Sequence, residues 1–390
     1  MKWKFYSLAF VAGMSILTAC SSDDNNDNDG NGGNGNGNEI ENGTILKGTI
    51  TSDVTLAAGN TYKLSGEYIV EEGATLHIEE GVKIIAVYDD IADYILVKQG
   101  GKINAVGTPD KPIVMTSEKE EPGAWGGIHI CGRAHTNAEG GKGSSEIGGA
   151  VYGGNDDADN SGTLQYIRLE YTGFAFDEEH EANGISFYSV GNGTIVDHCQ
   201  AYKGSDDGFE FFGGSVNVSN LVAVSCSDDS FDWTEGWNGK GTNLVAYQEA
   251  ESTLGYDCDC LMECDNNGSN NAATPVAHPV LKNLILVGNG GSKQGIRLRA
   301  GTEVEIDNAK VCGKGQPLTV ETALTENALK NGTSKLTNIT LSSELSSKEG
   351  IYTHADFIAV TSNKVDANLS YSSFEDIRKE CSWMNGSWVK

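Results

Sequence analysis

The sequence predicts an all-β fold, a single-stranded right-handed parallel β-helix whose coils stack as a solenoid with loop insertions. Three observations predict it. A six-residue pattern, mostly apolar at its first, fourth and sixth positions, returns along the chain at intervals of 22 to 40 residues. A shorter segment of alternating apolar residues precedes several of these repeats. Fifty glycines, six prolines and no long helical period favour stacked strands over a helical repeat.

The six-residue units carry Tyr, His or Asn at their third position in all but the earliest coils. They read LQYIRL, VDHCQA, VSNLVA, GTNLVA, LKNLIL, IDNAKV and LTNITL, at residues 164–169, 196–201, 218–223, 241–246, 281–286, 306–311 and 336–341. Side chains that alternate with period two lie on opposite faces of a strand. Each unit is therefore predicted to form one strand of one coil.

Asparagine takes the third position in five successive units. These residues are Asn220, Asn243, Asn283, Asn308 and Asn338. A buried amide is costly unless it is hydrogen-bonded, and stacked Asn side chains can bond to each other from coil to coil. We therefore expect an Asn ladder that stabilises the fold and is not a ligand site. Tyr166 and His198 hold the same position before the ladder begins.

The second strand of each coil is predicted in GISFY, GFEFF, SFDWT and GIRLR, at residues 184–188, 208–212, 230–234 and 295–299. When these segments are aligned, their outward positions form a column of polar side chains. The column contains Ser186, Glu210, Asp232 and Arg297, with Arg299 two residues further along. The segment LMECD places Glu263 on the missing coil of this column, and Asp265 follows it.

Two Asp pairs come directly before these strands. Asp206-Asp207 and Asp228-Asp229 are 22 residues apart, so we expect them on adjacent coils. Adjacent parallel strands are about 4.8 Å apart, and carboxylates at that separation repel each other. The repulsion within such a cluster must be relieved by a bound Ca²⁺, by the nearby arginines, or by raised pKa values that keep some carboxyls protonated. Calcium is the only cofactor that this pattern predicts.

Three interpretations of this acidic face remain open. The Asp residues could accept hydrogen bonds from turn backbone, as Asx-turns do. The face could instead bind Ca²⁺ through Asp206, Asp207, Asp228 and Asp229, and a glycan through Trp233, Trp237, Glu263 and Asp265. In the third interpretation the face is catalytic. Glu210 and Asp232 would then act as the carboxyl pair of a glycosidase, or Arg297 and Arg299 would serve a uronate lyase.

The N-terminus predicts export and a lipid anchor. Lys2 and Lys4 precede an apolar run, and Leu17-Thr18-Ala19-Cys20 resembles the lipobox of bacterial lipoproteins. Residues 1–19 are therefore predicted to be a signal peptide, and Cys20 the lipidated residue that attaches the protein to the outer membrane. Residues 20–44, rich in Asp, Asn and Gly, are predicted to be a disordered tether. Residues 45–390 form the β-helix domain, with a Cys-bearing insertion at 247–279.

Charge and cysteine content narrow the function further. The formal net charge is −28. Phosphate binding needs a basic face, so we do not expect nucleic acid as a partner. Eight cysteines follow Cys20, at positions 131, 199, 226, 258, 260, 264, 312 and 381. An even number in an exported protein predicts disulfides. A thiophilic metal at Cys258, Cys260 and Cys264 is the alternative, although the spacing fits no standard zinc site.

Several longer segments resemble a family of right-handed parallel β-helix lipoproteins of Bacteroidetes. They are GAWGGIHICGRA, YGGNDDADNSGTLQYIRLEYTG, SDDGFEFFGG, SDDSFDWTEGWNGK and GIRLRAG, within residues 123–301. The resemblance implies the fold and a location on the cell surface, but it carries no chemistry. Pectate-lyase-like enzymes share the broad fold, which alone does not assign a function. We therefore expect a glycan- or protein-binding surface lipoprotein, with a polysaccharide lyase or glycosidase, or an accessory subunit of an outer-membrane complex, as alternatives.

Overall fold

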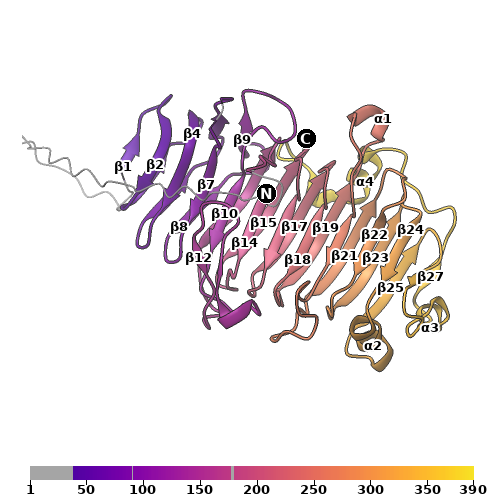
Figure 1. Cartoon of the computed structure of the whole chain (residues 1–390). Helices are drawn as coiled ribbons and strands as arrows, with labels where there is room; N and C mark the ends of the chain where they lie inside the picture. The colour runs from indigo at the N-terminus through magenta and orange to yellow at the C-terminus, as the bar shows by residue number, and fades with distance from the viewer. Residues whose placement is uncertain (1–37, 90, 177–179) are drawn as a thin grey trace, which may run out of the picture. The chain divides into compact units, whose positions relative to one another are not determined.

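The computed structural model describes residues 38–89, 91–176 and 180–390, all within the compact unit Asn36–Lys390. These residues form a right-handed parallel β-helix whose strands stack coil upon coil (Figure 1). The predicted signal peptide, lipobox and most of the tether lie outside the described residues. Within the described residues, no helix is both long enough and apolar enough to span a bilayer.

The first coils begin earlier than the composition suggested. Residues 38–44 were assigned to the tether, yet β1 (Asn38–Ile40) pairs with β3 (Val54–Leu56) in parallel. The other strands of these coils are β2 (Ile45–Ile50), β4 (Thr61–Val70), β5 (Thr75–Ile78), β6 (Lys83–Ala86), β8 (Lys102–Val106) and β9 (Ile113–Ser117). Residues 38–40 therefore belong to the β-helix and not to the predicted tether.

One parallel sheet carries the candidate site, and we call it the groove sheet. Its strands follow one another in chain order, each separated from the next by the rest of a coil. They are β7 (Tyr94–Val97), β10 (Ile128–Cys131), β14 (Ile185–Tyr188), β16 (Phe209–Phe212), β18 (Phe231–Thr234), β20 (Met262–Cys264), β22 (Gln294–Leu298), β24 (Gln316–Val320) and β26 (Ser346–Ser347). Strand β20 lies inside the predicted insertion, so the insertion contributes a coil.

Longer bent strands close each coil. The first half of β13 pairs with β8 and its second half with β9, so one strand serves two faces of the coil. The corresponding strand of each later coil pairs in parallel with that of the coil before it. They are β13 (Gly162–Glu170), β15 (Ile195–Tyr202), β17 (Asn217–Val224), β19 (Lys240–Tyr247), β21 (Val280–Val287), β23 (Glu305–Cys312), β25 (Lys335–Leu341) and β27 (Lys364–Val365).

The remaining elements are short and sit in the loops between strands or in the C-terminal segment after β27. A small antiparallel hairpin joins β11 and β12, and it lies over the outer surface of the groove sheet through Tyr152, whose ring is 5.1 Å from that of Tyr188. These elements are β11 (Gly143–Ser144), β12 (Val151–Tyr152), α1 (Glu251–Leu254), α2 (Ala323–Asn331), α3 (His354–Ala359), α4 (Phe374–Glu380) and the 3₁₀ turns Glu139–Gly141 and Ser382–Met384.

The inward side chains of the groove sheet form two columns. Phe209 pairs with Phe231, and Phe211 with Trp233, from coil to coil. Aromatic rings stack within the columns, with centroids 5.1 Å apart for Phe187 and Phe211. Because these apolar side chains fill the interior, their outward neighbours on the same strands are fixed in position. The core therefore sets the register of the site.

The Asn ladder is confirmed, but its residues occupy a bend and not the middle of a straight strand. Each Asn has a positive φ, from 55° to 63°, where the long strand turns from one face of the coil to the next. Asn tolerates this left-handed conformation better than most residues. The Nδ2 of Asn243 donates to Asn220 Oδ1 at 2.8 Å, and Asn283 donates to Asn243 at 2.9 Å. Asn283 is exposed, contrary to the prediction of a buried ladder.

At both ends of the column an Asp carboxylate takes the place of an Asn as acceptor, and the series of Asn-to-Asn bonds runs from Asn308 to Asn220. Asn220 Nδ2 donates to Asp197 Oδ1 at 2.7 Å, and Asn338 Nδ2 donates to Asp307 Oδ1 at 2.6 Å. Burial acts to raise the pKa of Asp197, but hydrogen bonds from His198, Ser219 and Asn220 outweigh it and hold that pKa below its usual value. His198 therefore has the structural role that its position in the column predicted.

The expected disulfides are absent from the described residues. All eight cysteines after Cys20 are free, and all eight side chains are buried. Cys264 lies in the inward column of β20, paired in register with Trp233, and Cys199 pairs with the inward residue Leu221. Burial raises the pKa of Cys199 above its usual value. Six of the thiols, at positions 131, 199, 226, 264, 312 and 381, belong to hydrophobic clusters and behave as small apolar core residues, which the even count alone did not reveal.

Candidate functional site

The predicted outward column is present. Glu210 pairs with Asp232, Asp232 with Glu263, and Glu263 with Arg297, on β16, β18, β20 and β22. Because β-strand side chains alternate between faces, the aromatic residues on either side point into the core and force these four outward. The prediction that Glu263 fills the missing coil is therefore confirmed.

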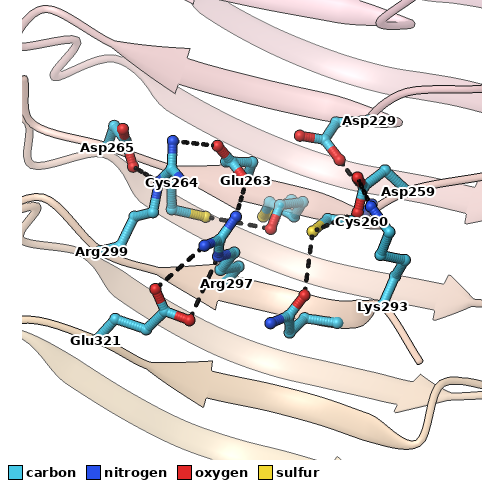
Figure 2. Close-up of polar contacts among 12 residues, drawn as sticks. Asp229, Asp259, Cys260, Glu263, Cys264, Asp265, Lys293, Arg297, Arg299 and Glu321 are labelled. Atoms are coloured by element: carbon cyan, nitrogen blue, oxygen red, sulfur yellow. Dashed lines mark hydrogen bonds and ion pairs between the residues drawn. The ribbon is translucent and has the colours of Figure 1, made fainter. Parts of the chain in front are cut away.

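A second column runs four residues ahead of the first. Asp206 and Asp228 were predicted there, and the structure adds Asp259 and Lys293, which form an ion pair with each other (Figure 2). The signal for Asp259 was in the sequence. It precedes Glu263 by the same four residues that separate Asp228 from Asp232. The irregular length of the insertion hid this repeat.

The two columns form a groove of about 500 Å³ on the outer surface of the sheet. Ten carboxylates and one guanidinium line it. The lining residues are Glu146, Glu181, Asp206, Asp207, Glu210, Asp228, Asp229, Asp232, Asp259, Glu263 and Arg297. Glu146 and Glu181 come from loops that pack against the sheet. No periodic signal pointed to them, because loop residues do not follow the coil repeat.

Asp207 and Asp229 carry out the turn-capping role that was one of the three interpretations. The backbone N–H of Asp229 donates to Asp207 Oδ1 at 2.8 Å, and that of Cys260 donates to Asp229 Oδ1 at 2.6 Å. Asn183 begins the series, since its Oδ1 accepts from the Asp207 N–H at 3.2 Å. These bonds join successive coils, and both Asp residues also line the groove.

Arg297 and Arg299 both form ion pairs with carboxylates. Figure 2 shows Arg297 between Glu263 and Glu321, with N–O distances of 2.9 and 3.3 Å. Arg299 contacts Glu263 at 2.5 Å and Asp265 at 2.7 Å. Paired in this way, neither guanidinium is placed to act as a base. Arg299 and Asp265 also lie outside the groove lining.

The groove carboxyls resist ionisation. Burial, and then the nearby charges of Asp228 and Glu181, raise the pKa of Asp206 to about 7. Burial, and then the nearby charges of Asp259 and Glu263, raise the pKa of Asp228 to about 6, and burial raises that of Glu146 to about 7. For Glu210 and Asp232, burial and neighbouring carboxylates raise the pKa well above the usual value. The groove therefore lacks enough positive charge to stabilise its carboxyl groups in their ionised form.

Three sets of carboxylates lie close enough to share a cation. In each set, one oxygen per residue lies within 4.8 Å of the others. The sets are Asp206, Asp207 and Asp228; Asp207, Glu210 and Asp232; and Asp229, Asp232 and Glu263. Oxygens around one Ca²⁺ lie about 2.3–2.6 Å from the ion, so pairs of them span up to about 5 Å.

Asp232 belongs to two of these sets, and its Oδ1 is buried without a hydrogen-bond partner in the described part of the chain. A buried carboxylate oxygen without a partner is costly, and a cation would satisfy it. By contrast, Glu210 Oε2 accepts a hydrogen bond of 2.5 Å from Asn183 Nδ2. Asn183 was missed in the sequence because it precedes its strand where the neighbouring coils have Asp.

The prediction that Trp233 and Trp237 contact a ligand is wrong, because both side chains are buried in the core. Trp233 and Trp237 are each only 1% exposed. The Trp233 indole N–H donates to Thr302 Oγ1 at 3.0 Å, and that of Trp237 donates to the Val216 carbonyl at 3.2 Å. Trp237 also stacks on Phe211 with ring centroids 4.2 Å apart. Both are core residues, because the alternation that turns Asp232 outward turns Trp233 inward.

Comparison with known proteins agrees with this architecture. The family described as pectate-lyase like beta helix domain matches residues 48–389, which is nearly the whole described part of the chain. No curated protein and no solved structure matches the sequence. On the strength of the stacked parallel coils and this match, the chain belongs to the family of pectate-lyase-like β-helix domains.

Proposed function

We propose that this protein is an exported, lipid-anchored surface protein that binds a glycan through the acidic groove, with Ca²⁺ as part of the binding site. The observation that carries the proposal is the charge imbalance of the groove. Ten carboxylates line it, while Arg297 is paired with Glu263 and Glu321. Buried like charges of this kind need a counter-ion.

The chemistry of the groove favours calcium over other metals. Its lining offers carboxylate oxygens from several coils, and Ca²⁺ prefers six to eight oxygen ligands in flexible geometry. A bound cation would also let hydroxyl or carboxylate groups of a sugar complete its coordination. Without the cation, the carboxylates would repel an acidic polysaccharide.

Calcium binding is tested by isothermal titration of metal-free protein with CaCl₂, beside the variant Asp232→Asn. We expect the wild type to bind Ca²⁺ and the variant to lose at least about tenfold in affinity, or about 1.4 kcal/mol. Glu344→Gln, an exposed acid outside the groove, is the matched control and should bind as the wild type does. Equal Ca²⁺ affinity in Asp232→Asn and wild type would contradict the proposal.

Glycan binding is tested on the same proteins with a panel of polysaccharides, in Ca²⁺ and in EDTA. We expect retention that needs Ca²⁺ and that Asp232→Asn weakens. Retention without turnover identifies a binding protein. If no polysaccharide is retained in either condition, a protein ligand at the cell surface replaces the glycan in the proposal.

Hydrolysis of a glycan is the second candidate, and one observation favours it. Glu210 and Asp232 lie on adjacent coils, in a set whose carboxylate oxygens lie within 4.8 Å of one another. Retaining glycosidases place two carboxyl groups about 5–5.5 Å apart, one of them protonated. New reducing ends that disappear in Glu210→Gln would establish this activity. A lyase that uses Arg297 or Arg299 as its base is disfavoured, since both form ion pairs.

The lipid anchor is tested separately from the groove. Cys20 lies outside the described residues, so its role depends on the sequence pattern alone. In cells that express the protein, we expect radiolabelled palmitate to enter the wild type and not Cys20→Ser. Labelling of both would remove the anchor from the proposal and leave the groove unaffected.

A further inference from the structure

A second pocket lies beside the acidic groove, at the other end of strand β18. Its volume is about 680 Å³, within the usual range for ligand sites. Its lining consists of Asn137, Ala138, Glu139, Thr234, Glu235, Asn267, Gly268, Ser269 and Asn270. Thr234 follows Asp232 on the same outward face of β18, about 7 Å further along the strand. The two sites share a strand but no lining residue.

Buried amides hold the two loops that form this pocket. Asn137 Nδ2 donates to Asn266 Oδ1 at 2.8 Å and to the Pro275 carbonyl at 3.0 Å. Asn267 Nδ2 donates back to Asn137 Oδ1 at 3.0 Å. Asn266 is fully buried, and its own Nδ2 donates to the Ala273 carbonyl. The loop 134–142 and the insertion are therefore locked together before any ligand arrives.

Glu235 anchors the pocket to the hairpin. Its Oε2 accepts hydrogen bonds from Thr136 at 2.7 Å and from the Tyr152 hydroxyl at 2.9 Å. Burial raises the pKa of Glu235, although these two hydrogen bonds oppose that effect. The pocket wall therefore has a fixed frame built from side chains of three separate segments.

Other polar groups of the lining are not used by the protein. Within the described part of the chain, the hydroxyls of Thr234 and Ser269, the Nδ2 of Asn270 and the carboxylate of Glu139 have no hydrogen-bond partner. They offer donors and acceptors from both loops and from the strand. The acidic groove offers almost only carboxylates, so the two sites differ in chemistry although they are adjacent.

We propose that this pocket binds an uncharged, hydroxyl-rich segment of the glycan, such as one or two neutral hexose units, next to the cation-binding groove. Sugar hydroxyls both donate and accept, which matches an amide, two hydroxyls and a carboxylate. A cationic ligand would favour the groove, where the negative charge is far greater. The inference rests on the proposed function in requiring a glycan, but it does not require the cation.

The test uses neutral, acidic and amino-sugar oligosaccharides as probes, with binding measured by titration in Ca²⁺ and in EDTA. We expect a neutral oligosaccharide to bind in both conditions. The double variant Ser269→Ala with Asn270→Ala should weaken that binding about tenfold, since it removes two hydrogen-bonding groups. Ser292→Ala, an exposed Ser outside the pocket, is the matched control and should bind as the wild type does.

The isosteric variant Thr234→Val provides a second test that leaves both loops intact, and it should also weaken the neutral probe. Binding of acidic probes alone, or neutral binding that neither variant changes, would overturn the inference. The two proposals fail separately. Loss of Ca²⁺ binding in Asp232→Asn with no effect of the pocket variants would sustain the groove alone. The reverse result would sustain the pocket alone.

Discussion

The residue at each corner of the long strands must accept a left-handed backbone, and this requirement explains the choice of Asn. Asn243 has φ of 59° and donates to Asn220, while its own Oδ1 accepts from Asn283. Tyr166 and His198 adopt the same conformation at 52° and 51°, and their rings stack with centroids 4.4 Å apart. The choice of residue in this column therefore depends first on the left-handed backbone conformation and second on hydrogen bonding.

Substitution of Asn243 separates these two contributions. Asn243→Gly keeps the conformation but loses two hydrogen bonds, which should lower the free energy of unfolding by about 1–2 kcal/mol. Asn243→Ala adds left-handed strain and should cost roughly 1 kcal/mol more. Urea unfolding measures both. Lys282→Ala, exposed beside the ladder, is the control, and equal stability of all three variants would contradict the ladder's role.

Asp232 gives a second residue-scale prediction, about stability in the absence of metal. Its buried Oδ1 has no partner in the described chain, and Glu263 and Asp265 add repulsion. In EDTA at pH 8, Asp232→Asn should therefore raise the melting temperature, because it removes one of the mutually repelling charges. In saturating Ca²⁺ the order should reverse. Calorimetry in both buffers checks the prediction, and a lower melting temperature of the variant in EDTA would refute it.

Alternation along each strand made the outward residues predictable, and it also shows where the prediction failed. Glu210, Asp232, Glu263 and Arg297 follow from period two and the coil spacing. The same rule turns Trp233 into the core, so proposing it as a ligand residue conflicted with its own position. The prediction of disulfides failed for another reason. Their number suggests pairing, but only three-dimensional placement shows whether two sulfurs meet.

At the scale of elements, the strands were predictable and the loops were not. Strand β20 has three residues, yet its alignment between β18 and β22 was expected from Glu263. Glu146 reaches the groove because Ile147 and Tyr152 pack on the outer face of the sheet. Such packing depends on surfaces that form only when the coils have stacked. The sequence therefore predicts eight of the eleven residues that line the groove, and it misses the two that come from loops.

The C-terminal segment makes the clearest element-scale prediction. Trp388 is fully buried, and its ring lies 5.2 Å from that of His198 and 6.1 Å from that of Tyr166. Trp388→Ala should lower the free energy of unfolding by about 3–5 kcal/mol, because it leaves a cavity over this corner. Trp383→Ala, at a half-buried position in the same segment, should cost less. Chemical denaturation ranks the two, and equal losses would show that the segment is not anchored by Trp388.

For the whole molecule, the groove predicts an unusual dependence of stability on pH. Asp206 and Glu146 have pKa values of about 7 in the folded state, and Asp228 about 6, against about 4 when unfolded. Between pH 4 and 7 the folded protein therefore holds more protons than the unfolded chain. Stability contributed by these groups is present at acid pH and is lost as pH rises through the folded pKa values.

Melting temperatures measured in EDTA should accordingly fall from pH 5 to pH 8. His129 acts in the opposite direction, since burial lowers its pKa to about 4, but it is one group against many carboxyls. Saturating Ca²⁺ should reverse the trend, because the cation binds the ionised groove. A melting temperature in EDTA that rises from pH 5 to pH 8 would contradict the raised pKa values of the groove carboxyls.

The columns of the groove change sign along the coils. On β16, β18 and β20 they carry Glu210, Asp232 and Glu263, and on β22 they carry Arg297, with Lys293 ahead of it. A linear molecule laid across these coils meets carboxylates at one end and carboxylate–cation ion pairs at the other. Its two orientations are therefore unequal in energy, so a polymer with chemically distinct ends would be held in one direction.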